Sequence, residues 1–297
     1  MTRSSPFRQI TIIGTGLIGG SLALALKKSG FRGKIVGCDG SLVLEKAKRR
    51  RTIDVAISDP LKACSKSDLV VLATPVGGII ELIEKLAPHL PSSALLTDVG
   101  STKSEVMSTA ERVFGTDVSR RFLGGHPMAG KENSGIEFAD AELFRDAVWF
   151  LTPSPKQTPK TAGVAEFSAL LKKLGTTIIA LDSAEHDRLC AWISHVPQMV
   201  STALAATLVE EYSDNSALLE AGGRALREMT RISASPYSMW RDIAITNKQQ
   251  IAEALLKLEQ ELAHIRENLD TRQLEEEFDR AHKLNRRSKR TQLRSRG

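Results

Sequence analysis

Near its start the chain passes from a short strand-like run directly into a glycine-rich turn. Residues 9–13 read QITII, residues 14–19 read GTGLIG, and a helix-like stretch follows. In a GxGxxG turn the first glycine permits a tight bend, the second lets the backbone approach a pyrophosphate, and the third allows close packing of the helix on the strand. The helix N-terminus then faces the phosphates. The pattern predicts a dinucleotide site formed by Gly14, Thr15, Gly16, Leu17, Ile18 and Gly19.

An acidic residue at the expected distance strengthens this prediction, because a lone glycine motif can also be a packing turn. Asp39 follows the strand-like run 34–38 and lies 20 residues after Gly19. A carboxylate there accepts hydrogen bonds from ribose hydroxyls and repels a 2′-phosphate, so the predicted cofactor is NAD. Thr74 and Pro75 end another predicted strand and are expected to border the cofactor, although Pro75 could simply end that strand.

Strand-like and helix-like segments alternate through the first 182 residues. The predicted strands are 9–13, 34–38, 69–73, 94–97, 121–124, 147–151 and 176–180. The predicted helices between them are 17–29, 41–51, 77–87, 103–114 and 161–174. This alternation is typical of βαβ units and a mainly parallel sheet. We therefore predict a Rossmann-type α/β domain over residues 1–182.

The pattern changes after residue 182, where no convincing strand remains. Helices are predicted at 189–209, with a kink at Pro197, and at 216–229, 238–268 and 271–284. The segment 238–268 carries one apolar stripe, which is typical of a helix that packs on other helices within the chain or across a dimer. We predict an all-α substrate and dimerisation domain at 183–285 and a basic tail without ordered structure at 286–297.

Composition excludes several classes of protein. The chain has 297 residues, of which 41% are hydrophobic, and no stretch approaches the roughly 20 apolar residues of a membrane span. Its three cysteines are far apart, which indicates a reducing, cytoplasmic setting. Eight of its 41 basic residues lie at 280–297, and the remaining 33 face 35 acidic residues, so the net charge of +6 belongs mostly to the tail. No specific nucleic-acid partner is expected, although nonspecific attraction to polyanions stays open.

Two segments at later strand ends carry groups suited to redox chemistry, and each has a structural alternative. His126 follows a predicted strand within GGHPMAG, where it would point into the crevice and accept the proton of an alcohol during hydride transfer. Ser101, in DVGSTK, could orient His126 or cap the helix 103–114. In the helical half, His195 could be a core histidine. Arg231 suits bidentate capture of a carboxylate, or a structural ion pair with Glu228 or Asp242.

Taken together, the motifs resemble the prephenate/arogenate dehydrogenase family of tyrosine biosynthesis. They are GxGxxG, DVGSTK, GGHPMAGKENSG, ISHVPQ and TRISASPYSMWRDI, in the family's order over about residues 8–285. The resemblance implies a homodimer that oxidatively decarboxylates a cyclohexadienol held between the two domains. It also implies the short form of the enzyme, without an added mutase or regulatory domain.

The resemblance also implies roles for single residues. His126 would take the proton of the substrate 4-hydroxyl, Ser101 would contact both His126 and that hydroxyl, and Arg231 would bind a substrate carboxylate. His195 would line the site and Trp240 would lie near it. Lys131 is a further candidate in the loop after His126, where it could face either the substrate or solvent.

One position departs from the family pattern. Several relatives that use prephenate have a second histidine three residues after the one matching His195, and here that residue is Gln198. A neutral glutamine can bond either a keto or an amino group, so prephenate, arogenate or both stay open as substrates. The competing functions are a β-hydroxyacid-type dehydrogenase, which generally relies on a lysine in the helical half, and a non-catalytic dinucleotide-sensing or nucleic-acid-binding protein.

Overall fold

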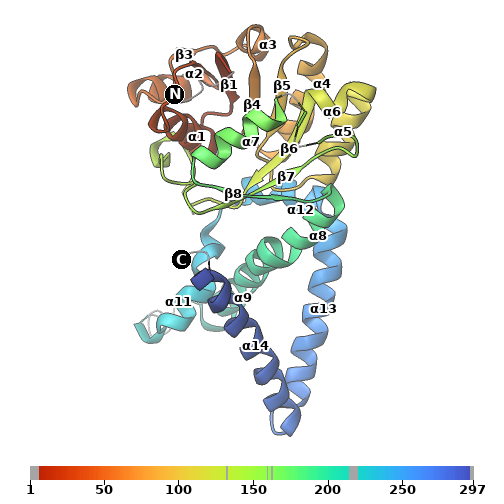
Figure 1. Cartoon of the computed structure of the whole chain (residues 1–297). Helices are drawn as coiled ribbons and strands as arrows, with labels where there is room; N and C mark the ends of the chain where they lie inside the picture. Colours follow the sequence, from red (N-terminus) through yellow and green to blue (C-terminus); the bar gives the residue numbers. More distant parts are fainter. Residues whose placement is uncertain (1–6, 132, 159, 162, 214–219, 295–297) are drawn as a thin grey trace. The chain divides into compact units, whose positions relative to one another are not determined.

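The computed structural model describes residues 7–131, 133–158, 160–161, 163–213 and 220–294. The chain divides by its internal contacts into two units, Met1–Lys248 and Gln249–Gly297. The first unit holds the sheet and the helices up to α12. The second holds α14 and all of α13 except its first residue, Lys248 (Figure 1). In the described part of the chain, no helix combines the length and apolar character needed to cross a bilayer.

Eight strands form one sheet in the order β3-β2-β1-β4-β5-β6-β7-β8. Neighbouring strands from β3 to β6 are parallel, β7 runs antiparallel to β6, and β8 runs parallel to β7. The strands are β1 (Gln9–Ile13), β2 (Lys34–Cys38), β3 (Val55–Ala56), β4 (Leu69–Leu72), β5 (Leu95–Asp98), β6 (Phe122–Pro127), β7 (Val148–Thr152) and β8 (Thr177–Ala180). The predicted Rossmann-type sheet is confirmed, and only the two-residue β3 was missed.

Side chains that alternate along the strands fill two separate hydrophobic clusters. In β4, Leu69 and Val71 join one cluster and Val70 and Leu72 join the other, because successive strand side chains point to opposite faces. Helices α1, α2 and α7 supply the first cluster, and α3, α4 and α5 supply the second. Both faces of the sheet are therefore covered, as a parallel sheet requires.

The helices around the sheet follow the amphipathic segments of the sequence. They are α1 (Leu17–Lys28), α2 (Ser41–Arg49), α3 (Pro60–Cys64), α4 (Val76–Leu86), α5 (Ser104–Phe114), α6 (Val118–Arg121) and α7 (Val164–Lys173). Two of them, α3 and α6, were not predicted from the sequence and span only five and four residues. Asp59 caps α3, since its Oδ1 accepts the Leu61 N–H at 2.9 Å.

The described residues after Asp182 form helices joined by short turns and no strand, as predicted. These helices are α8 (Ser183–Cys190), α9 (Val196–Tyr212), α11 (Arg224–Thr230), α12 (Tyr237–Thr246), α13 (Lys248–Glu267) and α14 (Arg272–Arg294). Between α8 and α9 the residues Ala191–His195 form a π-helical turn, labelled η4. Pro197 lies just after this π-helical turn, in the first turn of α9, so the regular α-helix is interrupted next to the position where a kink was predicted.

The single helix predicted over 238–268 is wrong in one respect, because it breaks at Asn247. Asn247 ends α12 with a non-helical backbone (φ −122°, ψ 26°), and α13 starts at the next residue. Its side-chain amide nitrogen donates to the Asp187 carbonyl oxygen at 2.8 Å and to His195 Nδ1 at 3.1 Å. Long-range contacts of this kind stabilise the break, and periodicity along the chain cannot reveal them.

The expected disorder from residue 286 also differs from the structure, which continues α14 to Arg294. Arginine, lysine, glutamine and leucine are good helix formers, and neither glycine nor proline occurs between 272 and 294. A high positive charge therefore did not prevent a helix. The part of the predicted segment 216–229 that falls at 216–219 lies outside the described residues, and so does Glu132 of the GKENSG motif.

Candidate active site

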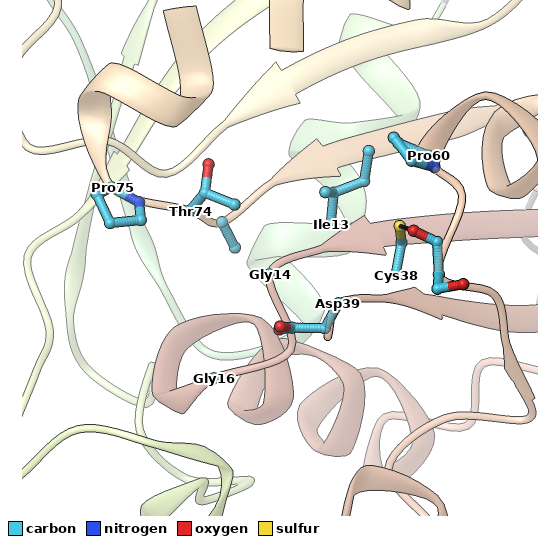
Figure 2. A pocket seen from close by; sticks show the side chains of 10 residues that line it. Ile13, Gly14, Gly16, Cys38, Asp39, Pro60, Thr74 and Pro75 are labelled. Carbon is cyan, nitrogen blue, oxygen red and sulfur yellow. Dashed lines mark hydrogen bonds between the residues drawn. The ribbon is translucent and has the colours of Figure 1, made fainter. Parts of the chain in front are cut away.

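A pocket opens at the carboxyl ends of β1, β2 and β4. Its lining residues are Ile13, Gly14, Gly16, Cys38, Asp39, Ser58, Pro60, Ala73, Thr74 and Pro75, and its volume is about 400 Å³. Figure 2 shows Asp39 beside the glycine turn and Thr74 with Pro75 across the pocket. The chain leaves β1 toward β2 on one side and returns to β4 on the other, so the pocket lies at a topological switch point, where open α/β sheets bind ligands.

The glycine turn fits a pyrophosphate. Gly14 has φ +92°, and a Cβ there would overlap the Ala73 carbonyl oxygen. A Cβ on Gly19 would overlap the Gly14 carbonyl oxygen, so this glycine allows α1 to pack closely on β1. Gly16 has open space where its Cβ would lie, which is the room that a phosphate needs. Thr15, Leu17 and Ile18 occupy the same turn and the start of α1.

Asp39 is held at the pocket wall by the glycine turn itself. Its Oδ2 accepts the Thr15 N–H at 2.7 Å and lies 3.3 Å from Thr15 Oγ1, and its Oδ1 accepts the Gly40 N–H at 2.7 Å. The carboxylate is half-buried and lines the pocket, so its negative charge faces whatever fills the cavity. This arrangement matches the adenosine ribose of NAD and opposes a 2′-phosphate.

His126 lies near the end of β6, two strands beyond β4 in the sheet, and belongs to a chain of three bonded side chains. His126 Nδ1 is 2.9 Å from His186 Nε2, and His186 Nδ1 is 2.9 Å from Asp187 Oδ1. All three side chains are buried. Asp187 also accepts the Lys103 and Ser104 N–H groups at 2.7 and 2.8 Å, which caps α5. The predicted cap of this helix by Ser101 is therefore replaced by Asp187.

The chemistry of this chain sets the proton positions. A carboxylate only accepts hydrogen bonds, so the His186 proton lies on Nδ1 and its Nε2 carries a lone pair. His186 Nε2 then accepts a hydrogen bond from His126 Nδ1–H, which leaves a lone pair on His126 Nε2. Asp187 thus holds His126, through His186, in the tautomer of a proton acceptor.

Burial keeps these groups in the protonation states that the chain requires. Burial is the largest cause that lowers the pKa of His126 well below its usual 6.5, and His186 and Lys103 lower it further. Burial also lowers the pKa of His186, against the opposing effect of Asp187. Burial alone would raise the pKa of Asp187, but hydrogen bonds from His186 and Ser104 outweigh it and lower that pKa. Both histidines are therefore neutral near pH 7, and Asp187 is ionised.

A buried ion pair fixes the strand ends beside His126. Lys103 and Asp98 are fully buried and bond each other. Asp98 also accepts the Gly100 N–H at 2.8 Å and the Gly125 N–H at 3.1 Å. The pair therefore ties the end of β5 to β6, one residue before His126. The local sequence carries no signal for this pair, because a lysine five residues from an aspartate is usually a surface residue.

His195 lies in the π-helical turn and presents one unmatched donor. Asn247 contacts the Asp187 carbonyl oxygen, which only accepts, so the contacting side-chain atom of Asn247 is its amide nitrogen. The same nitrogen contacts His195 Nδ1. His195 Nδ1 is then the acceptor, and its proton lies on Nε2. That atom is buried and finds no partner among the described residues. Burial lowers the pKa of His195 to about 4, so the group is a neutral donor suited to a ligand oxygen.

Trp240 lies next to this donor. Its ring meets that of His195 edge to face, with centroids 6.0 Å apart. The Trp240 Nε1 atom is also buried without a partner in the described part of the chain. The two neighbouring N–H groups, of His195 and Trp240, could therefore donate hydrogen bonds to oxygen atoms of a ligand.

The other predicted site residues are placed as follows. Ser101 is half-buried, three residues after Asp98. Gln198 is buried on α9 and donates from Nε2 to Thr202 Oγ1 at 3.1 Å. Lys131 bonds Asp140 Oδ2 at 3.0 Å and the Phe138 carbonyl oxygen at 3.3 Å, so its ammonium is held within its own loop.

Arg231 is exposed in the turn after α11, although the sequence suggested apolar surroundings. The two acids considered as its structural partners have the following bonds. Glu228 bonds Arg224 at 2.7 Å. Asp242 bonds Arg241 at 3.1 Å and accepts the Gly77 N–H at 2.9 Å.

Three residues of the site, His186, Asp187 and Asn247, were not predicted from the sequence. Adjacent histidine and aspartate at the start of a helix is a weak pattern, because it is common on solvated helix faces. Only the packing of α8 against the end of β6 gives these residues a role. Asn247 was hidden inside a segment that looked like a continuous helix.

This fold and this site define a class of protein, the NAD-dependent dehydrogenases with a Rossmann domain followed by a helical domain. Two family models cover most of the chain. One, described as the nucleotide-binding domain of prephenate dehydrogenase, matches residues 22–180, and the other, described as its dimerisation domain, matches residues 182–283. The chain belongs to the prephenate dehydrogenase family.

Individual relatives agree with this assignment. Prephenate dehydrogenase of Lactococcus lactis is 35% identical over 93% of this chain and 76% of its own length. The crystal structure of A. aeolicus prephenate dehydrogenase, in complex with hydroxyphenyl propionate and NAD⁺, is 31% identical with a TM-score of 0.83, over 96% of this chain and 98% of that one. Synechocystis arogenate dehydrogenase is 30% identical with a TM-score of 0.73, over the same shares of the two chains.

Proposed function

We propose that this protein catalyses the NAD-dependent oxidative decarboxylation of prephenate, arogenate or both, in tyrosine biosynthesis. The observation that carries the proposal is the bonded chain His126–His186–Asp187, which lies near the end of β6, in a sheet whose parallel strands β1, β2 and β4 carry a dinucleotide pocket at their carboxyl ends. It supplies a neutral, buried base on the same edge of the sheet as the cofactor. Relatives named prephenate, cyclohexadienyl and arogenate dehydrogenases support the substrate class.

His126 acts as the general base in this proposal. Its Nε2 lone pair accepts the proton of the substrate 4-hydroxyl, while Nδ1 stays bonded to His186. NAD⁺, when bound by the glycine turn and Asp39, supplies the hydride acceptor. Loss of the ring carboxylate as CO₂ then leaves an aromatic product. Ser101, in the loop after β5, is proposed to orient the same hydroxyl.

Two groups from the helical part are proposed to hold the substrate. His195 offers its orphaned Nε2–H to a substrate oxygen. Because His195 is neutral, a cation for the carboxylate must come from elsewhere, and Arg231 is the proposed source. A contact between Lys131 and the substrate stays a prediction, since Lys131 bonds Asp140 in this structure.

Gln198 bears on the choice between the two substrates. It lies three residues after His195, on the same side of the helix, and its nitrogen is bonded to Thr202. Its carbonyl oxygen is an acceptor, which suits the amino group of arogenate better than the keto group of prephenate. We propose that the enzyme accepts arogenate, with or without prephenate.

The proposed assembly is a homodimer formed by residues after about 182. Its support is the dimerisation-domain family model together with exposed apolar side chains on the described later helices, among them Val209, Tyr212, Leu262 and Phe278. We retain the division into domains at 1–182 and 183–285, with the basic segment after 285. A cytoplasmic location is proposed from three cysteines that are all free and buried.

A steady-state assay of NADH formation tests the function. Prephenate and arogenate are each supplied with NAD⁺ and with NADP⁺. We expect turnover with at least one cyclohexadienol and a kcat/KM for NAD⁺ at least about tenfold above that for NADP⁺, because Asp39 opposes a 2′-phosphate. Arg231→Ala should raise the KM for the cyclohexadienol by a factor that corresponds to about 2–5 kcal/mol. Binding of NAD⁺ without turnover of either compound would instead support a dinucleotide sensor.

A further inference from the structure

A cluster of three buried side chains at the end of β6 has the composition of a metal site. His126 Nδ1, His186 Nε2 and Cys190 Sγ all lie within 4.8 Å of one another. The Cys190 sulfur is 3.4 Å from His186 Nε2 and 3.9 Å from His126 Nδ1, and the two nitrogens are 2.9 Å apart. His186 and Cys190 are four residues apart on α8, so one helix face presents both to β6.

The spacing matches the ligands of a tetrahedral zinc ion. With Zn–N bonds of about 2.05 Å and Zn–S bonds of about 2.3 Å, two nitrogen ligands lie about 3.3 Å apart and a nitrogen and a sulfur about 3.5 Å apart. The observed distances of 2.9, 3.4 and 3.9 Å differ from these values by a few tenths of an ångström. Small side-chain rotations suffice to admit the ion.

The surroundings also suit a cation. Asp187 accepts the Nδ1–H of His186, which is the carboxylate–histidine arrangement that orients a metal-bound imidazole and makes it more basic. Lys103 is the nearby positive group, and Asp98 neutralises it. Nitrogen with sulfur ligands selects zinc or a similarly soft cation over magnesium or calcium.

We infer that His126, His186 and Cys190 form a latent binding site for zinc, and that occupation of the site inhibits the enzyme. The inhibition rests on the proposed role of His126 as base. Zinc displaces the thiol proton of Cys190 to solvent and takes the lone pair of His186 Nε2. It also takes the lone pair of His126 Nδ1, so the single proton of His126 moves to Nε2. His126 then has no lone pair for the substrate hydroxyl.

Binding is measured first, without substrate. The full-length, chelator-treated protein is titrated calorimetrically with zinc alone and, separately, with Co²⁺, whose thiolate complexes absorb strongly. We expect one zinc per chain and a thiolate–cobalt band. Cys190→Ala should lose the band and bind zinc at least about tenfold more weakly, equivalent to 1.4 kcal/mol. Cys64→Ala, which removes another free buried cysteine, is the matched control and should bind as the wild type does.

Activity is measured next with the same proteins. Zinc should lower kcat of the wild type and of Cys64→Ala, and a chelator should restore it. Cys190→Ala should keep the basal kcat and need at least about tenfold more zinc for half inhibition. If the alanine variant does not fold, Cys190→Ser gives the same test. Serine has nearly the shape of cysteine, but its hydroxyl is a poor zinc ligand.

Equal zinc affinity in Cys190→Ala and the wild type would overturn the inference. Zinc binding through Cys190 that leaves kcat unchanged would overturn the inhibitory role. A protein that binds zinc through Cys190 but oxidises neither cyclohexadienol would support the site and refute the proposed function, so the two failures are distinguishable.

Discussion

At the scale of single residues, proton positions in this site follow from groups that can only accept or only donate. The Asp187 carboxylate orients His186, and His186 orients His126. The Asp187 carbonyl identifies the Asn247 nitrogen, which in turn orients His195. Asp187 therefore orients two histidines through intermediate residues: His126 becomes a hydrogen-bond acceptor at Nε2, and His195 becomes a donor at Nε2.

His126→Asn tests the acceptor. A general base acts in the transition state, so we expect kcat to fall by about 10²–10⁴-fold while the Kd for NAD⁺ stays within about twofold. Steady-state kinetics and NAD⁺ titration measure the two quantities. Turnover close to that of the wild type would remove His126 from the mechanism and turn attention to Ser101 and His195.

Asn247→Asp tests the donor. An aspartate at this position only accepts, so His195 would carry its proton on Nδ1 and lose its Nε2 donor. We expect the KM for the cyclohexadienol to rise about tenfold, near the 1.4 kcal/mol of one hydrogen bond, with an unchanged KM for NAD⁺. Asn268→Asp is the control, because the amide nitrogen of Asn268 also contacts Nδ1 of a histidine, His264 of α13, outside the proposed site. A similar rise in both variants would contradict the assignment.

At the scale of elements, side chains from the helical part cap helices of the sheet domain. Asp187 caps α5, and Asp242 of α12 accepts the Gly77 N–H in the first turn of α4. Thr102 and Thr246 add a hydroxyl pair at 2.7 Å. These bonds join segments that are distant in the sequence but belong to the same unit.

Asp242→Ala measures what such a cap contributes. We expect the free energy of unfolding to fall by about 0.5–2 kcal/mol, the usual range for the loss of a helix cap. Urea unfolding followed by circular dichroism gives the value. Asp279→Ala removes an exposed acid on α14 and should change it by less than about 0.5 kcal/mol. Equal effects in the two variants would show that the cap adds no stability.

At the scale of the whole molecule, buried histidines link stability to pH. His126, His186 and His195 have pKa values lowered mainly by burial, with that of His195 at about 4. The unfolded chain binds protons at these histidines below about pH 6.5, where the folded chain does not. Stability is therefore lost as pH falls from about 6.5 toward 4, by up to about 1.4 kcal/mol per pH unit for each histidine.

Urea unfolding across this range checks the sign and the source of the effect. His195→Asn should flatten the dependence of unfolding free energy on pH. His89→Asn, which replaces an exposed histidine, should leave it unchanged. A wild type that gains stability as pH falls through this window would contradict the expectation.

The proposed homodimer and the basic end of α14 can be tested together. Light scattering at micromolar concentration should give twice the chain mass of 32.4 kDa. A protein shortened by residues 286–297 should keep kcat within about twofold, because no residue of the proposed active site lies in this segment. A large loss of kcat would show that the segment reaches the active site, and a monomer would reject the dimer.

Much of this protein was determined by its sequence alone, because the deciding physics is local. A glycine turn after a strand needs particular backbone angles, and strands buried on both faces need unbroken apolar runs, so the sheet domain and its pocket could be predicted to within a few residues. His126 could be proposed as a site residue because glycines and a proline place it at a strand end, although its side chain proves to be buried.

Only the tertiary structure decided which polar residues act together. The roles of His186, Asp187 and Asn247 arise because α8 and the end of α12 pack at the end of β6, and nothing in their local spacing distinguishes them from solvated helix residues. Asn247 also breaks a helix whose periodicity is continuous, because its amide gains two long-range bonds. Hydrogen bonds within a buried site set the proton positions, since in water each of these histidines would exchange freely between its two tautomers.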